Sequence, residues 1–246
     1  MDILKYKKLS NSRYKVYFKD GSSVILHENI ILKYSLLLTK KIDDIDELTK
    51  ENNFYLLYDI ALKYISIKMR CESEMRTYLK KKQIDNDIID KVVDKLKKDN
   101  LINEKNYVKS FIADKINLNK YGQNKIRNEL SKLKLDENII NEEINKINQD
   151  DLRNNLEALI DKKIKSNKKY AGDDLKQKIL TDLINKGYKK EDILNVLTQK
   201  DLSNDDLYDK EYEKLYNKYS KKYSEEQLEY IIKQKLYQKG LKKNNY

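Results

Sequence analysis

The sequence lacks several residues on which common protein classes depend. Its 246 residues contain one cysteine, one histidine, five glycines and no proline or tryptophan. A single cysteine cannot form an internal disulfide, and one histidine with one cysteine cannot complete a His/Cys zinc site. These absences exclude disulfide-rich scaffolds and zinc fingers.

Long apolar runs are also missing. No stretch approaches the roughly 18 apolar residues of a membrane-spanning helix, and the mean hydropathy is −0.89. The first twenty residues carry a charged or hydroxyl side chain every few positions, unlike the apolar core of a secretory signal. We therefore expect a cytoplasmic protein that has no contact with a membrane.

Positive charge exceeds negative charge, with 52 Lys and Arg against 41 Asp and Glu and a formal net charge of +11. AT-rich codons also enrich Lys, so the distribution of charge along the chain is more informative than its sum. Arginine is rare, and Lys cannot replace its planar fork, so each arginine suggests a contact with demanding geometry. A local ion pair is the alternative in each case. The five arginines are Arg13, Arg70, Arg76, Arg127 and Arg153.

The first fifty or so residues have the pattern of a small β module. Two β-prone runs, Arg13–Phe18 and Val24–His27, flank a Gly-containing turn of the hairpin type. A third strand over Ile3–Leu9 would complete a β-meander. A short helix is expected at Glu28–Lys33, followed by an Asp-rich connection at 43–46.

The rest of the chain is predicted to be helical. From Asn53 onward, apolar residues recur at steps of three and four, as in amphipathic helices. Asn and Asp residues stand at expected N-caps, and isolated glycines separate the periodic segments. The expected N-caps include Asp85, Asn103, Asp136 and Asn204. The glycines at boundaries are Gly122, Gly172, Gly187 and Gly240.

An internal repeat organises the helical part. Six apolar positions between Met75 and Leu96 are apolar again 51 residues later; five of them recur after a further 53 residues, and three recur once more. Such a period predicts three short helices in each repeat. The first helices are expected at 54–67, 104–118, 152–166 and 206–219.

These repeats predict a mainly α fold in which three-helix repeats stack as an elongated, curved array behind the N-terminal β-meander. A compact bundle with fortuitous spacing is the alternative. We expect the N-terminal module and linker at 1–50, repeats at 51–102, 103–150 and 151–201, and a partial repeat at 202–246.

Charge follows the type of helix. Segments 68–82 and 120–134, the second helices of the first two repeats, each carry a net charge of +4, whereas 85–100 and 136–150 carry −1 and −4. Stacking would align the basic helices as a ridge suited to an acidic protein groove or a phosphate backbone. Ordinary solvated helix faces are the alternative.

The later repeats follow this charge pattern less well. Segments 173–187 and 225–239 are each balanced at three basic and three acidic residues. A separate run of lysines at 162–169 cannot be placed from the sequence.

No catalytic constellation is found. The glycines form no phosphate-binding loop, and His27 has no neighbouring nucleophile, so we expect it at the surface. Cys71 lies beside Arg70, where a thiol pKa can fall, but a tolerated small residue is the preferred interpretation. We expect neither enzymatic activity nor a metal or cofactor.

Most of the tyrosines are expected to lie in the core or to be half-buried. Examples are Tyr58, Tyr107, Tyr188 and Tyr237.

The motifs together resemble the RecX family. Residues 61–83, ALKYISIKMRCESEMRTYLKKKQ, are similar to the opening of the family's first three-helix repeat, with Cys71, Met75 and Gln83 in place of its usual Ser, Leu and Gly. Leu101–Glu104 followed by Tyr107 resembles the start of the second repeat.

Further matches extend this resemblance to nearly the whole chain. Gly122 with the downstream Lys125–Arg127 and Glu129–Leu130 resembles the second repeat. Residues 182–197 resemble the third repeat, and 233–240 resemble the extra C-terminal repeat of members whose N-terminal β-meander is similar to residues 1–35.

The resemblance implies a regulator of the recombinase RecA, in recombination, DNA repair and the SOS response. RecX proteins bind the RecA filament on single-stranded DNA and suppress its recombinase, ATPase and co-protease activities. We expect a monomer that contacts RecA, and DNA directly or through the filament. The candidate contacts are Lys68, Arg70, Arg76, Lys80, Lys125 and Arg127.

Alternatives remain open for the contacts and for the function. The alternative for each candidate contact is a solvated helix residue or a partner of Glu74 or Glu129 within its own repeat. The alternative functions are a helical repeat protein that coats DNA or RNA without sequence preference and a purely structural scaffold.

Overall fold

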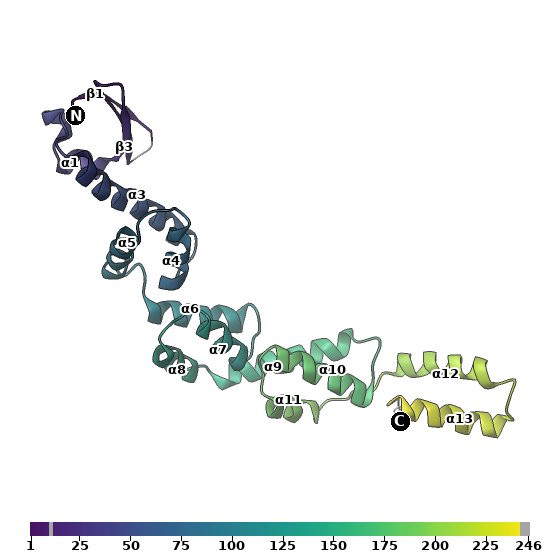
Figure 1. The fold of residues 1–246 in the computed structure, drawn as a ribbon. Coiled ribbons are helices and arrows are strands. Elements are labelled where there is room, and N and C mark those ends of the chain that lie inside the picture. Colours follow the sequence, from purple (N-terminus) through teal and green to yellow (C-terminus); the bar gives the residue numbers. More distant parts are fainter. Residues whose placement is uncertain (10–11, 242–246) are drawn as a thin grey trace. The chain divides into compact units, whose positions relative to one another are not determined.

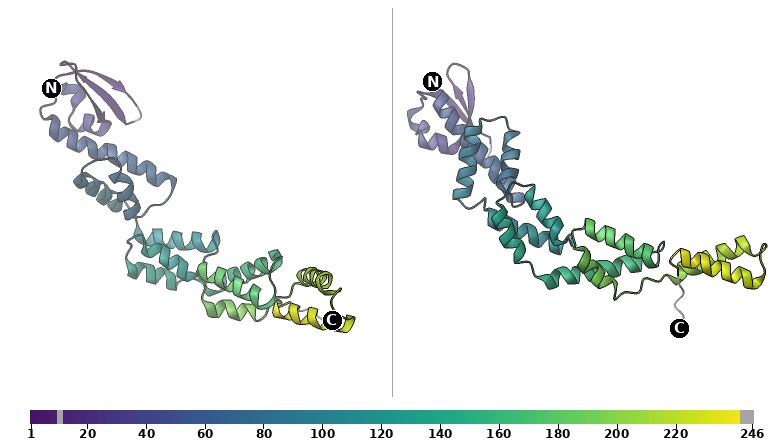
Figure 2. Two further views of the ribbon diagram at one scale, coloured as in Figure 1. Left: turned by 45° about the vertical axis from the view of Figure 1, so that its right-hand side comes forward. Right: turned by 60° about the horizontal axis from the view of Figure 1, so that its bottom comes forward.

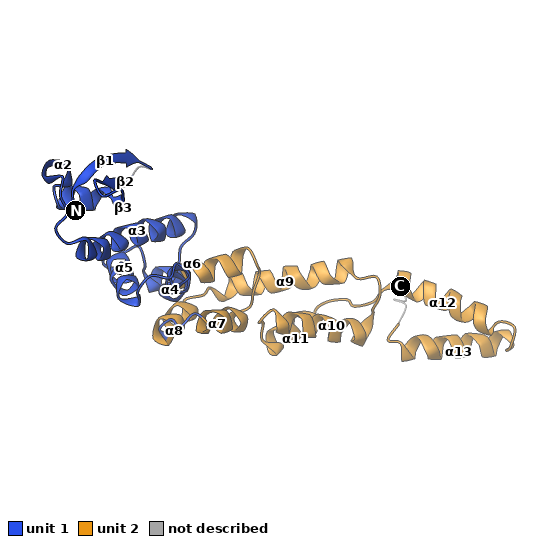
Figure 3. Ribbon diagram, turned by 45° about the horizontal axis from the view of Figure 1, so that its top comes forward, with its two compact units in different colours: residues 1–107, 133–136 blue, residues 108–132, 137–246 orange. Residues whose placement is uncertain are grey.

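The computed structural model describes residues 1–9 and 12–241 of the chain. It divides into two units, unit 1 with residues 1–107 and 133–136 and unit 2 with residues 108–132 and 137–246 (Figure 3). The described residues form thirteen helices and one three-stranded sheet. No helix in this described part is both long enough and apolar enough to cross a lipid bilayer.

The N-terminal sheet is antiparallel in the order β1-β2-β3 (Figure 1). Its strands are β1 (Ile3–Lys8), β2 (Arg13–Phe18) and β3 (Ser23–His27). Gly21, with a φ of +88°, lies in the turn of the second hairpin, where a left-handed residue is needed. Leu26 and its neighbours on the inner face are buried. The predicted β-meander is confirmed.

Two short helices and one long helix cover the sheet's inner face. They are α1 (Glu28–Lys33), α2 (Leu36–Thr39) and α3 (Ile45–Ile67). The Asp44 carboxylate caps α3 by accepting the amide hydrogens of Asp46 and Glu47. Because of this cap the first long helix begins nine residues before its predicted start at 54, within the expected Asp-rich connection.

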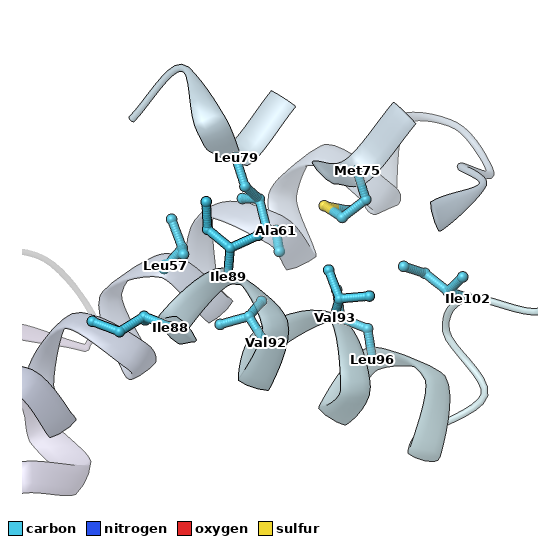
Figure 4. Packing of buried hydrophobic residues seen from close by; sticks show 10 residues of the cluster. All are labelled: Leu57, Ala61, Met75, Leu79, Ile88, Ile89, Val92, Val93, Leu96 and Ile102. Atoms are coloured by element: carbon cyan, nitrogen blue, oxygen red, sulfur yellow. The ribbon is translucent and has the colours of Figure 1, made fainter. Parts of the chain in front are cut away.

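Helix α3 serves two separate cores in unit 1. Its N-terminal half places Leu48 in the core of the β module. Its C-terminal half packs Leu57 and Ala61 against α4 (Glu72–Lys80) and α5 (Asn86–Lys98), as Figure 4 shows. The long helix therefore joins the β module to the first repeat through continuous backbone.

The remaining helices continue the three-helix order of the first repeat. Helix α6 begins in unit 1 and continues into unit 2. In Figure 1 and in both views of Figure 2, α12 and α13 run antiparallel side by side. The helices are α6 (Glu104–Asn117), α7 (Gln123–Ser131), α8 (Glu137–Asn145), α9 (Gln149–Ser166), α10 (Gly172–Asn185), α11 (Lys190–Leu197), α12 (Asp205–Tyr219) and α13 (Glu225–Gln238).

The helix bounds confirm the internal repeat. Helices α4 and α7 are both nine residues long and begin 51 residues apart, and α10 and α13 are both fourteen residues long and begin 53 residues apart. One apolar position of the second helix is at most 1% exposed in all four repeats. Its residues are Met75, Ile126, Ile179 and Ile232.

The fold class is therefore confirmed as mainly α, with three-helix repeats behind a small β-meander. The elongated, curved arrangement and the exact repeat boundaries stay predictions. The last five residues of the partial repeat expected at 202–246 lie outside the described residues.

A recurrent left-handed turn follows the second helix of every repeat. Gln83, Lys134, Gly187 and Gly240 have φ values of 56°, 55°, 94° and 69°. This turn, or the residue just before it, contacts the neighbouring repeat. The contact is made by the start of the second helix of the repeat that precedes it in the chain. In unit 1 the Ser73 hydroxyl donates to the Leu133 carbonyl at 2.6 Å.

The same junction in unit 2 uses backbone against backbone. The Gly122 amide donates to the Lys186 carbonyl at 2.9 Å, and the Asn124 amide donates to the Gly187 carbonyl at 3.1 Å. These bonds satisfy amides that have no partner within helix α7. A Cβ on Gly122 would lie 2.3 Å from the Gly187 carbonyl carbon, so only glycine allows this approach.

Candidate partner-binding surfaces

The two residues considered for catalysis have structural roles. His27 is 5% exposed, stacks on Tyr55 with ring centres 5.3 Å apart, and its Nδ1 accepts the Asn29 amide hydrogen at the start of α1. Its predicted surface position was wrong. Cys71 is buried, and that burial raises the pKa of its thiol, which does not suit a reactive thiolate.

The described residues contain no group of three or more His, Cys, Asp or Glu side chains placed to hold a metal ion. Tyr107 and Tyr188 are buried as expected, and the Tyr188 hydroxyl donates to the Lys120 carbonyl at 3.1 Å. Burial raises the pKa of Tyr188 to about 12. Tyr237 is 67% exposed, so its predicted burial was wrong.

Arg70 is held by aromatic stacking in unit 1. Its guanidinium carbon lies 3.9 Å from the centre of the Tyr64 ring. That ring stacks on Tyr78 at 3.9 Å between centres, and the Lys82 ammonium lies 5.1 Å from the Tyr78 ring centre. A planar guanidinium suits this stack better than a lysine does. Arg70 also pairs with Glu74 at 3.8 Å.

Arg76 is compensated by acidic neighbours within its own repeat. Its Nε donates to Glu72 at 2.8 Å, and its Nη1 donates to Asp90. Lys97 also donates to Glu72 at 2.8 Å, and chiefly that hydrogen bond lowers the pKa of Glu72. Much of the charge of α4 is therefore used to join α4 to α5.

Arg127 repeats this contact 51 residues later. Its Nη1 donates to Asn141 Oδ1, and thus joins α7 to α8 as Arg76 joins α4 to α5. A further 53 residues along, both positions are leucine. Leu180 is buried in the core around α10 and α11, and the partly buried Leu194 packs against this core. The two positions are thus polar in two repeats and apolar in the third.

Lys68 and Lys80 are the exposed candidates of unit 1. Lys68 follows the end of α3, and Lys80 is the last residue of α4. Within the described residues neither side chain forms an ion pair. Glu129 pairs with Lys115 at 2.7 Å, and not with a candidate contact.

Lys125 lies in a lysine-rich hollow of unit 2. The hollow is shallow and open to solvent, has a volume of about 610 Å³ and is formed by residues before and on α7 together with α9 and α10. We refer to it as the lysine hollow. Its charged and aromatic lining residues are Tyr121, Lys125, Lys162, Lys163, Asp182 and Lys186.

The lysine hollow concentrates positive charge around one aromatic ring. The ammonium groups of Lys125 and Lys186 lie 4.3 Å and 5.2 Å from the centre of the Tyr121 ring. Asp182, the carboxylate of the lining, already accepts from Lys163 at 2.6 Å and pairs with Lys178 at 3.2 Å. Burial first, and then Lys125 and Lys163, lower the pKa of Lys186.

The structure thus brings together residues that sequence reasoning kept apart. Lys162 and Lys163 belong to the lysine run that the sequence could not place, and they line the same hollow as Lys125. Lys186 was missed because its segment has balanced charge. The one hint in the sequence is that Lys186 directly precedes Gly187, a boundary glycine.

Comparison with known proteins identifies the family. The model of the first three-helix domain of RecX matches residues 58–96, and that of the second three-helix domain matches residues 103–143. The regulatory protein RecX of Bacillus mycoides is 31% identical over 250 residues, which cover 96% of this chain and 92% of the relative. The chain belongs to the RecX family.

Other RecX proteins match over different lengths. The RecX of Oceanobacillus iheyensis is 27% identical over 206 residues, covering 81% of this chain and 76% of the relative. The RecX of Lactococcus lactis strain IL1403 is 43% identical over 102 residues, and this alignment covers only 38% of that protein.

Solved structures support the same fold. A crystal structure of regulatory protein RecX has a TM-score of 0.64 at 20% identity, covering 80% of this chain and 98% of that one. A crystal structure of RecX from Lactobacillus salivarius has a TM-score of 0.54 at 26% identity, covering 61% of this chain and 97% of that one.

Proposed function

We propose that this RecX protein is a non-enzymatic, monomeric regulator in the cytoplasm that binds the RecA filament on single-stranded DNA. It lowers the filament's recombinase, ATPase and co-protease activities. Membership of the RecX family, whose relatives are named regulatory proteins, is the observation that carries the proposal. Exposed Lys68 and Lys80 and the lysine hollow provide the charge to contact acidic protein surface and phosphates.

Regulation requires a difference in affinity between states of the filament. A ligand shifts an assembly only toward the state that it binds more tightly. We propose that the basic surfaces bind the filament in a form that hydrolyses ATP slowly, so that binding stabilises this form. Lys80 and Lys125 lie on equivalent second helices, which suits contacts with a repeating assembly.

The second candidate function is coating of nucleic acid without contact to RecA. The lysine hollow is the observation that favours it, because uncompensated ammonium groups bind phosphates regardless of sequence. Coating would inhibit RecA only by occupying DNA.

A titration of RecA ATPase at two salt concentrations separates these functions. Filament binding predicts inhibition at protein concentrations well below saturation of the DNA, and only a moderate effect of salt. Coating predicts inhibition that follows DNA occupancy and falls steeply with salt. A structural scaffold predicts no inhibition at either concentration.

The same titration tests the candidate contacts. We expect K68Q/K80Q/K125Q to lose more inhibition than R76Q/R127Q, because both of these arginines already bind partners within their own repeats. Arg153, an exposed arginine paired with Glu157 and outside the candidate set, provides the control R153Q. Full inhibition by both K68Q/K80Q/K125Q and R70A/R127A would refute the contact assignment.

A further inference from the structure

The lysine hollow contains more positive charge than its surroundings neutralise. Lys125, Lys163 and Lys186 reach it from α7, α9 and the C-cap of α10. Among the described residues, only Lys163 of these three has a recorded carboxylate partner, Asp182, which it shares with Lys178. The half-buried ammonium groups of Lys125 and Lys186 therefore share the hollow, and neither has a carboxylate partner of its own.

This arrangement has an electrostatic cost that an anion would relieve. The pKa of Lys186 is lowered by burial and by the charges of Lys125 and Lys163, so the folded chain disfavours the charged form of this lysine. The Tyr121 ring offsets part of the repulsion, because ammonium groups are attracted to an aromatic face. A bound anion would relieve the rest.

The placement of the lysines on three elements indicates which anion fits. Lys125 on α7, Lys163 on α9 and Lys186 at the C-cap of α10 suit a group with oxygen atoms on several sides, as in a tetrahedral phosphate. The two oxygens of a carboxylate share one plane, whereas the oxygens of a phosphate group are placed tetrahedrally around phosphorus. The charged residues of the lining are four lysines and Asp182. Because the hollow is open to solvent, a chain can continue beyond the bound group.

We propose that the lysine hollow is a phosphate-binding site that holds a backbone phosphate of single-stranded nucleic acid on Lys125, Lys163 and Lys186. The choice of single-stranded DNA as the source rests on the proposed function, whereas the phosphate chemistry does not. The site depends on two neighbouring repeats, because the Gly122–Gly187 contact brings the start of α7 against the turn that carries Lys186.

The test uses the full chain and a fluorescein-labelled oligothymidylate, with anisotropy measured over a range of salt concentrations. Losing the one phosphate contact of the hollow in K125Q/K186Q is expected to weaken binding about tenfold and to reduce the slope of log K against log salt by about 0.7. K132Q/K190Q removes equal charge from exposed lysines of unit 2 and is the matched control. Its affinity for the oligothymidylate is expected to fall less than about threefold.

A second control, K125R/K186R, keeps the positive charge and is expected to retain binding. It separates the loss of charge from misfolding.

Competitors distinguish the sources of the anion. We expect unlabelled oligothymidylate to displace the probe, and thymidine monophosphate or inorganic phosphate to do so only weakly at equal ionic strength. Equal losses in K125Q/K186Q and K132Q/K190Q would refute the site. Displacement by polyglutamate as effective as by oligothymidylate would show that the hollow binds acidic protein.

This outcome is independent of the effect on RecA. If the chain leaves RecA ATPase unchanged while K125Q/K186Q selectively loses oligothymidylate binding, the proposed function fails and the phosphate site stands. If the chain inhibits RecA and K125Q/K186Q binds oligothymidylate like the control, the phosphate site fails alone.

Discussion

At the scale of single residues, the rarity of arginine indicates geometry rather than partner contact. Arg70 stacks on Tyr64, and Arg76 and Arg127 bridge second and third helices at equivalent positions. At these three positions the guanidinium group makes directional contacts, which is what the rarity of arginine suggested. The sequence could not show that Arg76 and Arg127 bind partners within their own repeats. Each partner lies 14 residues further along the chain, and only the packing of the two helices brings it close.

The double variant R127L/N141L tests this structural role. The third repeat has leucine at both positions, so the variant is expected to keep its free energy of unfolding within about 1 kcal/mol of the parent. Urea denaturation measures the difference. I126A, which truncates a buried residue of the same helix, is expected to cost about 2–4 kcal/mol. A loss in R127L/N141L as large as in I126A would contradict the equivalence of the repeats.

The variant K186Q tests the repulsion within the lysine hollow. Because the folded-state pKa of Lys186 lies below its unfolded value of 10.5, the folded chain binds fewer protons than the unfolded chain between these two pH values. The cost is present below the folded pKa and is relieved as the pH rises through it. K186Q removes this cost at every pH.

We therefore expect K186Q at pH 7 and low salt to be more stable than the parent by a few tenths of a kcal/mol, after allowance for solvent screening. The difference should shrink as the pH approaches 10.5. Denaturant titrations at several pH values measure it, with K190Q as the control. Lower stability of K186Q at pH 7 would show that the lysine stabilises the fold.

At the scale of elements, spacing predicted most of what is observed. The apolar period located the second helices of all four repeats, because a buried position must recur on one face of each helix. The start of α3 was misplaced because Asp44 acts as an N-cap within a segment that looks like a linker. The brief α2 carries no periodic signal, being only four residues long.

The contact between repeats could not be predicted from spacing. Gly122 has an ordinary φ and is needed only because the backbone at Gly187 lies against it. G122A is expected to destabilise the chain by about 2–3 kcal/mol, since its Cβ would meet backbone atoms that cannot move aside. Gly21 has a positive φ and open space around it, so G21A should cost only about 1 kcal/mol. Chemical denaturation compares them, and equal costs would contradict the close approach.

At the scale of the whole molecule, buried residues form several separate cores, and the lysine hollow joins the second and third repeats at their surface. Distinct clusters of buried residues lie in the β module, in the first and third repeats and in the C-terminal helices. Family and fold class followed from the order of motifs along the chain. The lysine hollow did not, because it unites lysines from segments up to 61 residues apart that only the folded chain brings together.

The proposed function requires the chain to prefer the RecA filament to bare DNA. The most direct test immobilises a single-stranded DNA and measures the affinity of the labelled chain for it, first bare and then covered by RecA. The filament is held assembled by a slowly hydrolysed ATP analogue, and salt is physiological. We predict at least about tenfold tighter binding to the filament, equivalent to about 1.4 kcal/mol. Equal or weaker binding to the filament than to the bare DNA would contradict the proposed function.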